Sequence, residues 1–333
     1  MKTHHCMFDG VSGAGLGEVL ADLEPNPPEE PKKKQRKQRA RGPKEEQPSD
    51  MELFQQGLSS LLRTPYRVTG WMTKMGWRSL AMIPQKRKHR ELIAGSAPRT
   101  IFNGALTSRR GITFATISLG DVKAIKKHFG VKVNDVILAI CGSALRNYLK
   151  AQKALPEEPL VAGVPISTRE EGDKNLDNQV GTLSVSLETQ LKDPVKRLKE
   201  IHKRSVAAKD IAGEMGATDV QAMGTALPPV AIELASWLMS SAKLDAKIPL
   251  AANTIISNVP GPPMPLYICG GKVEAIYPLA PVLVGMGLSI TIMSYINDVN
   301  FGFMLDPNLV PEPWLLAEGI ENGVKELKDA IES

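Results

Sequence analysis

Two adjacent histidines, His4 and His5, stand near the start of the printed sequence in the stretch THHCMFDGVSG, which continues to Asp9 and Gly10. An imidazole with a pKa near ~6.5 can take a proton from a hydroxyl group at neutral pH. Asp9 can fix the local backbone or meet a basic residue, and Gly10 lets the chain bend without a Cβ clash. The stretch therefore predicts a histidine that acts as a general base.

Other chemistries fit the same stretch less well. His4, His5, Cys6 and Asp9 offer metal-ligand atoms, but adjacent side chains diverge and the other three histidines lie in surroundings rich in Lys and Arg, so we expect no metal. GVSGAG lacks the second glycine of a GxSxG nucleophile turn, and GAGLG lacks the spacing of a dinucleotide-binding loop. A buried histidine with a purely structural role remains as the alternative.

The composition is that of a globular protein with a local concentration of positive charge. Of the 333 residues 42% are apolar, which is enough to bury a core, and the formal net charge is +5. Residues 32–44 hold eight Lys and Arg and no acidic residue, so the rest of the chain is slightly acidic. This run contains no aromatic residue and adjoins no DNA-binding motif, so we expect no nucleic-acid partner. A solvated linker is the first interpretation of the run, and attraction to anionic lipid headgroups is the second.

Cysteine usage and hydrophobic runs bear on the cellular compartment. Three widely separated cysteines without CxxC spacing indicate neither a disulfide framework nor a zinc ribbon, and they fit a reducing cytoplasm. The first ten residues lack the apolar core of a signal peptide. The most apolar stretch, residues 280–296, is interrupted by Pro281, Gly285 and Gly287 and is slightly short for a bilayer crossing. We expect a cytoplasmic protein with buried strands at 280–296.

The order of the expected elements indicates an α/β fold. Residues 24–50, rich in Pro and charge, predict a disordered linker, and residues 51–82, rich in Leu and Met, predict a helix. Strands are expected at 112–119, 160–167, 178–188, 253–262, 272–282 and 287–306, the last as a hairpin with its tip at 297–298. Helices are expected to end at Gly130, to begin at an Asn134 N-cap, to run from Pro194 to about Lys209, and to close the chain through Leu316, Ile320, Val324, Leu327 and Ile331.

Several stretches, in this order, carry a resemblance to a known family. HHxxxDG, from His4 to Gly10, is the signature of the CoA-dependent acyltransferase superfamily. Together with VNDVILAICGSALRNYL, VPISTR, DNQVGTLSVSL and the region from NTIISNVPGP to FGFMLDP, it resembles the bacterial wax ester synthases/diacylglycerol acyltransferases over nearly all of the chain outside the charged linker. Members of that family carry a substantial segment before HHxxxDG, so the resemblance implies a chain truncated at its N-terminus.

The fold implied by the resemblance is of the CoA-dependent acyltransferase type. It has two α/β sandwich lobes with mixed sheets and flanking helices, here with an incomplete N-terminal lobe, and the histidine lies in a tunnel between the lobes. Residues 1–23 would be a remnant of the N-terminal lobe that carries HHxxxDG, 24–50 the disordered charged linker, 51–110 a helical crossover segment and 111–333 the C-terminal acyltransferase lobe.

The activity implied by the resemblance is O-acyl transfer from acyl-CoA. The acceptor is diacylglycerol, which gives triacylglycerol, or a long-chain alcohol, which gives a wax ester. His5 would be the general base in a reaction without an acyl-enzyme, His4 would orient its neighbour, and Asp9 would be a structural brace. Acyl-CoA would be a co-substrate, and neither a cofactor nor a metal is expected.

Five further residues are candidates for contacts with the substrate or with the reacting oxyanion. Asn258 is the candidate oxyanion donor, and Gly10 belongs to the histidine motif. Asn134 and Asp135 match the family's ND motif, and helix capping is the equally open alternative for both. Arg169 could meet a phosphate of CoA or could simply lie on the surface.

Two alternatives to a complete enzyme in solution stay open. The chain could be a catalytically impaired fragment that binds lipid or a partner. Residues 58–80, in which Trp71 and Trp77 stand beside Arg and Lys, could lie at a membrane or lipid-droplet surface, or they could pack across the two lobes. The inner face of the plasma membrane, or a lipid inclusion, is the expected place of such peripheral attachment.

Overall fold

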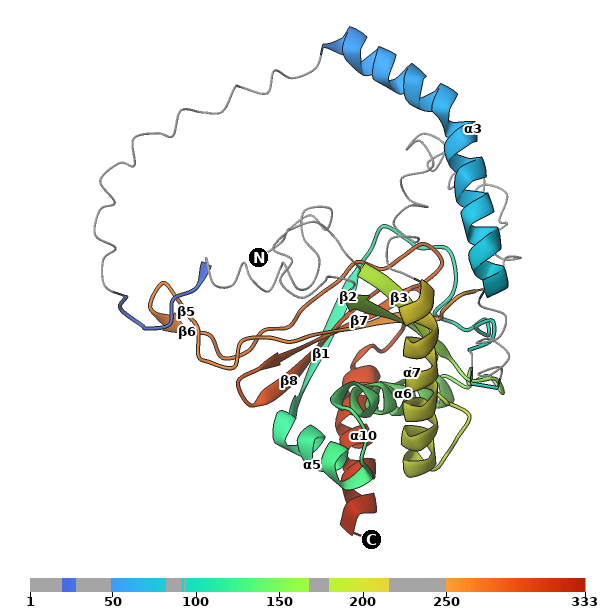
Figure 1. Ribbon diagram of the computed structural model, residues 1–333. Coiled ribbons are helices and arrows are strands. Elements are labelled where there is room, and N and C mark those ends of the chain that lie inside the picture. The colour runs from blue at the N-terminus through green and yellow to red at the C-terminus, as the bar shows by residue number, and fades with distance from the viewer. Residues whose placement is uncertain are drawn as a thin grey trace.

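A six-stranded mixed sheet with helices packed against it forms the body of the protein, an α/β fold as expected (Figure 1). The computed structural model describes residues 20–27, 49–81, 91–92, 94–167, 180–215 and 250–332. The sheet order is β1-β8-β7-β4-β2-β3, where β4 is parallel to both β2 and β7 and the other neighbours are antiparallel. The strands are β1 Gly111–Ser118, β2 Val161–Ser167, β3 Val180–Ser186, β4 Thr254–Val259, β7 Leu288–Tyr295 and β8 Asp298–Leu305.

Of the five helices among the described residues, four gather on one side of this sheet and one lies apart from it (Figure 1). The four are α5 Leu119–Phe129, α6 Val133–Ala151, α7 Pro194–Met215 and α10 Trp314–Glu332. Helix α3, Asp50–Ala81, extends away from the sheet and its helices. A small hairpin of β5, Tyr267–Ile268, and β6, Gly271–Lys272, forms a second sheet.

The local sequence explains where most of these elements begin and end. Thr113, Ala115 and Ile117 of β1 are buried while Ile112 and Phe114 are exposed, which is the period of two expected for a strand with one buried face. Strands β7 and β8 lie inside the sheet and are buried almost throughout, so their apolar residues run continuously. The hairpin between them turns at residues 296–297, beside the expected tip.

Helix boundaries follow capping chemistry. Gly130 ends α5 with φ 67°, a left-handed conformation that glycine adopts without strain. Asp193 caps α7, because its Oδ1 atom accepts the backbone N–H groups of Val195 at 2.9 Å and of Lys196 at 3.0 Å. The helix expected to run from Pro194 to about Lys209 begins there and continues to Met215.

Helix α6 is the centre of the helical layer, and α10 crosses it at close range. Residues 135–145 of α6 are all buried. Two glycines of α10 face α6, and a Cβ atom on Gly319 would lie 2.8 Å from the Cα atom of Ala144. The backbones can approach this closely only because a side chain is missing at the crossing.

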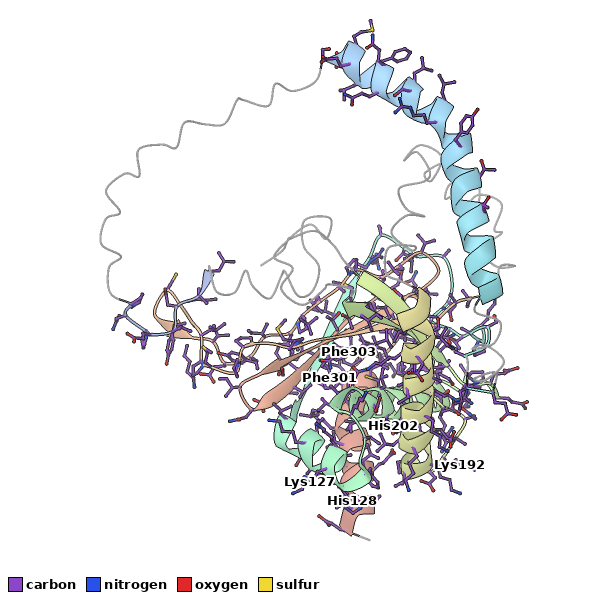
Figure 2. The ribbon with its side chains drawn as sticks, viewed as in Figure 1. Lys127, His128, Lys192, His202, Phe301 and Phe303 are labelled. Carbon is purple, nitrogen blue, oxygen red and sulfur yellow. The ribbon has the colours of Figure 1, made fainter. Side chains whose placement is uncertain are left out.

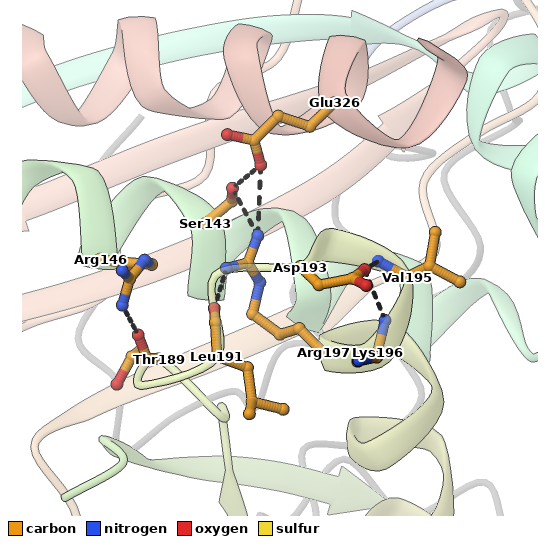
Figure 3. A network of polar contacts seen from close by, with 9 residues as sticks. All are labelled: Ser143, Arg146, Thr189, Leu191, Asp193, Val195, Lys196, Arg197 and Glu326. Carbon is orange, nitrogen blue, oxygen red and sulfur yellow. Dashed lines mark hydrogen bonds and ion pairs between the residues drawn. The ribbon is translucent and has the colours of Figure 1, made fainter. Parts of the chain in front are cut away.

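Arg197 of α7 ties three helices together (Figure 3). Its guanidinium donates to the carbonyl oxygen of Leu191 at 2.8 Å, to Ser143 Oγ of α6 at 3.0 Å and to Glu326 Oε2 of α10 at 3.2 Å. Ser143 also donates to Glu326. The Arg197 side chain is only 2% exposed, and burial lowers its pKa although Glu326 opposes that shift. A buried charge is tolerated when it is paired and hydrogen-bonded, so this network holds α7 and α10 against α6.

Two expectations from the sequence were wrong. Helix α6 begins at Val133 after an extended Lys132, so Asn134 lies inside the helix and is not its N-cap. The expected strand at 272–282 does not form beyond Lys272. Pro278 and Pro281 have no N–H for a ladder, and the carbonyl of Pro278 lies so close to Gly302 of β8 that a Cβ atom there would clash with it.

Within the described ranges no single helix is both long and apolar enough to cross a membrane. The bent pair α5 and α6, at 106°, passes that test together by length and composition alone. The stretch 280–296, expected as buried strands, contains β7. Residues 28–48 of the linker expected at 24–50, and the HHxxxDG stretch, lie outside the described residues.

Candidate functional site

A small cavity lies between the sheet and helices α6 and α7. Its volume is about 120 Å³, which is below the range of about 300–1,000 Å³ typical of complete small-molecule sites. Strands β2 and β3 supply an apolar wall, and the polar side chains come from α6, α7 and β4. The lining residues are Val164, Pro165, Ile166, Leu183, Val185, Asn134, Ser205, Lys209 and Asn258. Such a cavity can hold one polar group, with apolar surface beside it.

Asn134 and Asn258, both candidates from the sequence, meet in the wall of this cavity. Asn258 shares a face of β4 with the buried Thr254 and Ile256, and this alternation turns its side chain toward the first turn of α6. Its Nδ2 atom donates to Asn134 Oδ1 at 3.5 Å. A carboxamide has two N–H donors, so one such contact leaves donor capacity for a bound oxygen atom.

Asp135 is next to Asn134 in the chain but points elsewhere. Its side chain is 1% exposed, and its Oδ2 atom accepts the backbone N–H of Lys132 at 3.0 Å and lies 2.6 Å from His202 Nδ1 of α7. The first contact closes the start of α6, and the second joins α6 to α7. Asp135 therefore fixes the helical turn that carries Asn134, from behind the wall of the cavity.

Ser205 and Lys209 also line the cavity, and no motif in the sequence pointed to either of them. Ser205 is 3% exposed, and its Oγ atom has no hydrogen-bond partner among the residues that the structure describes. An unpaired buried hydroxyl beside a cavity is free to bind a ligand atom. Their spacing offered a signal, because His202, Ser205 and Lys209 recur at intervals of three and four on one face of α7.

The remaining candidates cannot be placed against this cavity. His4, His5, Asp9, Gly10 and Arg169 lie outside the described residues. Of the candidates from the sequence, the structure thus brings together Asn134 and Asn258, and it places Asp135 behind them.

Chemically, the cavity offers neutral and cationic donors next to an apolar wall. The carboxamides of Asn134 and Asn258, the hydroxyl of Ser205 and the ammonium of Lys209 can all donate hydrogen bonds. Donors held in place by secondary structure stabilise negative charge on an oxygen atom, because they need little reorganisation when that charge develops. The arrangement suits a carbonyl group or an oxyanion at the end of an apolar chain.

Comparison with protein families finds a match for each of two ranges of the chain. Residues 1–137 match the wax ester synthase/diacylglycerol acyltransferase catalytic domain, and residues 176–328 match the WS/DGAT C-terminal domain. These two matches include the HHxxxDG stretch and both cavity asparagines.

Individual proteins agree with this assignment. A Mycobacterium tuberculosis protein named as a diacylglycerol O-acyltransferase is 32% identical over 98% of this chain, which spans 63% of that relative. The O-acyltransferase WSD of Acinetobacter baylyi is 30% identical over 99% of this chain and 70% of its own length. The wax ester synthase/diacylglycerol acyltransferase structure from Marinobacter aquaeolei VT8 superposes with a TM-score of 0.64 at 26% identity, covering 99% of this chain and 68% of that one. The chain belongs to the wax ester synthase/diacylglycerol acyltransferase family.

Proposed function

We propose that the protein transfers a fatty acyl group from acyl-CoA to diacylglycerol, to a long-chain alcohol, or to both. Membership of the family and the names of the relatives support this activity. The observation that carries the proposal is the meeting of Asn134 and Asn258 in the wall of a cavity that is otherwise largely apolar. Such a site fits the carbonyl end of an acyl chain.

The proposed reaction has one base and no covalent intermediate on the enzyme. A ring nitrogen of His5 removes the hydroxyl proton of the acceptor while the hydroxyl oxygen attacks the thioester carbonyl. The new C–O bond leaves a tetrahedral oxyanion, which Asn258 stabilises with Asn134 holding its carboxamide in place. The intermediate collapses, the C–S bond breaks, and His5 returns the proton to the thiolate of CoA.

The other candidates have supporting parts in this proposal. His4 orients His5, Asp9 braces the turn of the motif, and Gly10 allows the bend. Arg169 binds a phosphate of CoA.

Transfer of a radiolabelled acyl group tests the activity directly. We expect labelled triacylglycerol from diacylglycerol or a labelled wax ester from hexadecanol, formed in equal amount to the CoA released. We expect Asn258→Ala to lower kcat by about 10²–10³-fold, the usual loss for one oxyanion donor, with KM little changed. Wild-type turnover in Asn258→Ala would remove the oxyanion role of this residue.

The competing proposal is a catalytically impaired protein that binds lipid or a partner, and the cavity volume of about 120 Å³, below that of complete small-molecule sites, supports it. Acyl-CoA would then bind with no release of CoA in the presence of either acceptor. Release of CoA coupled to ester formation would exclude this alternative.

We further propose that the protein acts in the cytoplasm and attaches peripherally to the inner face of the plasma membrane or to lipid inclusions. Helix α3 supports this, because its first half exposes large apolar side chains at helical spacing: Met51, Phe54, Leu58, Leu62 and Tyr66. The basic run at 32–44 would add attraction to anionic headgroups.

Flotation with liposomes tests the attachment. We expect binding that requires anionic lipid, weakens with salt, and is lost in a Leu58→Gln/Leu62→Gln variant. A Gln56→Ala variant, which changes a residue on another side of the same helix, should float as the wild type does. Flotation that both variants leave unchanged would refute a role for the apolar side of α3.

A further inference from the structure

A second hollow lies in the helical layer, between the α5–α6 loop and the N-terminal half of α7. Its volume is about 490 Å³, which is within the range of small-molecule sites. Phe129 at the end of α5, Val131 of the α5–α6 loop and Leu191 from the segment before α7 supply apolar surface. It shares no lining residue with the cavity of Asn134 and Asn258. We call it the lysine-rimmed groove.

The rim of the groove is positively charged. Lys196, Lys199 and Lys203 line it and are exposed, and the acidic residue among the lining residues is Glu200. Glu200 Oε1 is 2.6 Å from Lys203 Nζ, so one lysine is already paired. Lys196 and Lys199 carry the remaining positive charge of the rim.

Further basic residues lie close in the chain to lining residues of the groove. Lys127 and His128 lie at the end of α5, and Lys192 lies just before α7 (Figure 2). The start of α7 is not itself open to an anion, because the Asp193 carboxylate occupies its N–H groups. An anion at this end of the protein would therefore meet lysine side chains.

His202 sits at the inner side of the groove and is held in place. Its Nδ1 atom lies 2.6 Å from Asp135 Oδ2, and its side chain is 31% exposed. The contact with Asp135 thus holds in place a ring that lines the groove. Preorganised side chains lower the ordering cost of binding.

We propose that the lysine-rimmed groove binds a single-chain anionic amphiphile, of the class of long-chain fatty-acid carboxylates. The chain lies on Phe129, Val131 and Leu191, and the carboxylate lies between Lys196 and Lys199. Apolar surface rimmed by charge is typical of sites that bind a ligand with both properties. The aliphatic stems of the lysines extend the apolar surface, while their ammonium groups meet the charge.

Titration of the isotope-labelled protein with dodecanoate, below its micelle concentration, tests this by NMR. We expect saturable shifts of backbone amide signals in residues 129–132 and 191–203. Acetate, phosphate and the uncharged dodecyl maltoside should each shift these signals much less, because each lacks the chain or the charge. A Lys196→Gln/Lys199→Gln variant should bind dodecanoate about 3- to 20-fold more weakly, the loss expected for two exposed charge pairs.

A control variant and three outcomes decide the result. Lys150→Gln removes one charge from the exposed end of α6, away from the groove, and should leave the affinity unchanged. Equal shifts with acetate or phosphate would mean a simple anion site, and equal shifts with the maltoside would mean an apolar patch without charge recognition. Shifts confined to residues around Asn134 and Asn258 would place the chain in the other cavity. Each of these overturns the proposal, and none depends on acyl transfer, because no acyl-CoA or acceptor is present.

Discussion

Replacement of Arg197 by alanine should lower the free energy of unfolding more than any change to a surface ion pair does. The substitution removes hydrogen bonds of 2.8, 3.0 and 3.2 Å to Leu191, Ser143 and Glu326. Breaking a buried ion pair costs about 3–5 kcal/mol when the partner charge stays buried. Glu326 is 37% exposed, so water can solvate its carboxylate again. We therefore expect a loss near the lower end, about 3 kcal/mol.

Urea denaturation followed by circular dichroism measures this loss. The midpoint should fall while the slope with urea stays the same, because the folded structure is otherwise unchanged. Arg197→Met/Glu326→Gln removes both charges and keeps most of the packing, so it should cost about 1 kcal/mol or less. Lys203→Ala, which removes an exposed pair on the same helix, should cost at most about 0.5 kcal/mol.

Either of two results would show that Arg197 does not stabilise the fold through its buried charge pair. One is a loss below about 1 kcal/mol for Arg197→Ala, the range of exposed pairs. The other is a double variant that is as unstable as Arg197→Ala, since then lost packing and not an unpaired charge would explain the cost.

Three further predictions concern packing and titration. Gly319→Ala should lower the stability by about 1–3 kcal/mol in thermal unfolding, despite the helix preference of alanine. Asn322→Ala, on the exposed side of α10, should not lower the stability. Equal effects of the two substitutions would contradict the close crossing of α10 and α6. Burial, with the charge of a nearby glutamate, raises the pKa of Tyr148 to about 12, so stability should fall as the pH rises from about 10 to 12. The Tyr148→Phe variant should lack this part of the fall in stability. Identical pH profiles of stability for the variant and the wild type would contradict the raised pKa of Tyr148. Burial raises the pKa of the Cys141 thiol, so a thiol reagent should label the exposed Cys269 in the native protein and Cys141 only after unfolding; equal labelling rates would contradict this burial.

The sequence predicted those elements that are determined by residues close together in the chain. The run ITFATISL predicted β1, and the pair Asp193 and Pro194 predicted the start of α7, because capping and a fixed φ act within a few residues. The strand expected at 272–282 was wrong because prolines interrupt it and because a close approach to Gly302 is a tertiary contact.

The candidate site was only partly predictable for the same reason. Asn134 and Asn258 were each found by their motifs, but they are 124 residues apart, and no local pattern shows that their side chains meet. Ser205 and Lys209 were missed because a helix face gains meaning only once the sheet opposite it is known. The Asn134 N-cap was wrong because Asp135, one residue later, makes the capping contact.

The proposed mechanism rests on one imidazole that moves the proton in acyl transfer, so the decisive measurement is the rate of ester formation by His5→Ala. With diacylglycerol and acyl-CoA at saturation, we expect His5→Ala to be slower by about 10²–10⁴-fold while its circular dichroism spectrum and unfolding midpoint match the wild type. The control His128→Ala, which changes an exposed histidine at the end of α5, should turn over as the wild type does. Ester formation by His5→Ala at the wild-type rate would contradict the general-base role of His5.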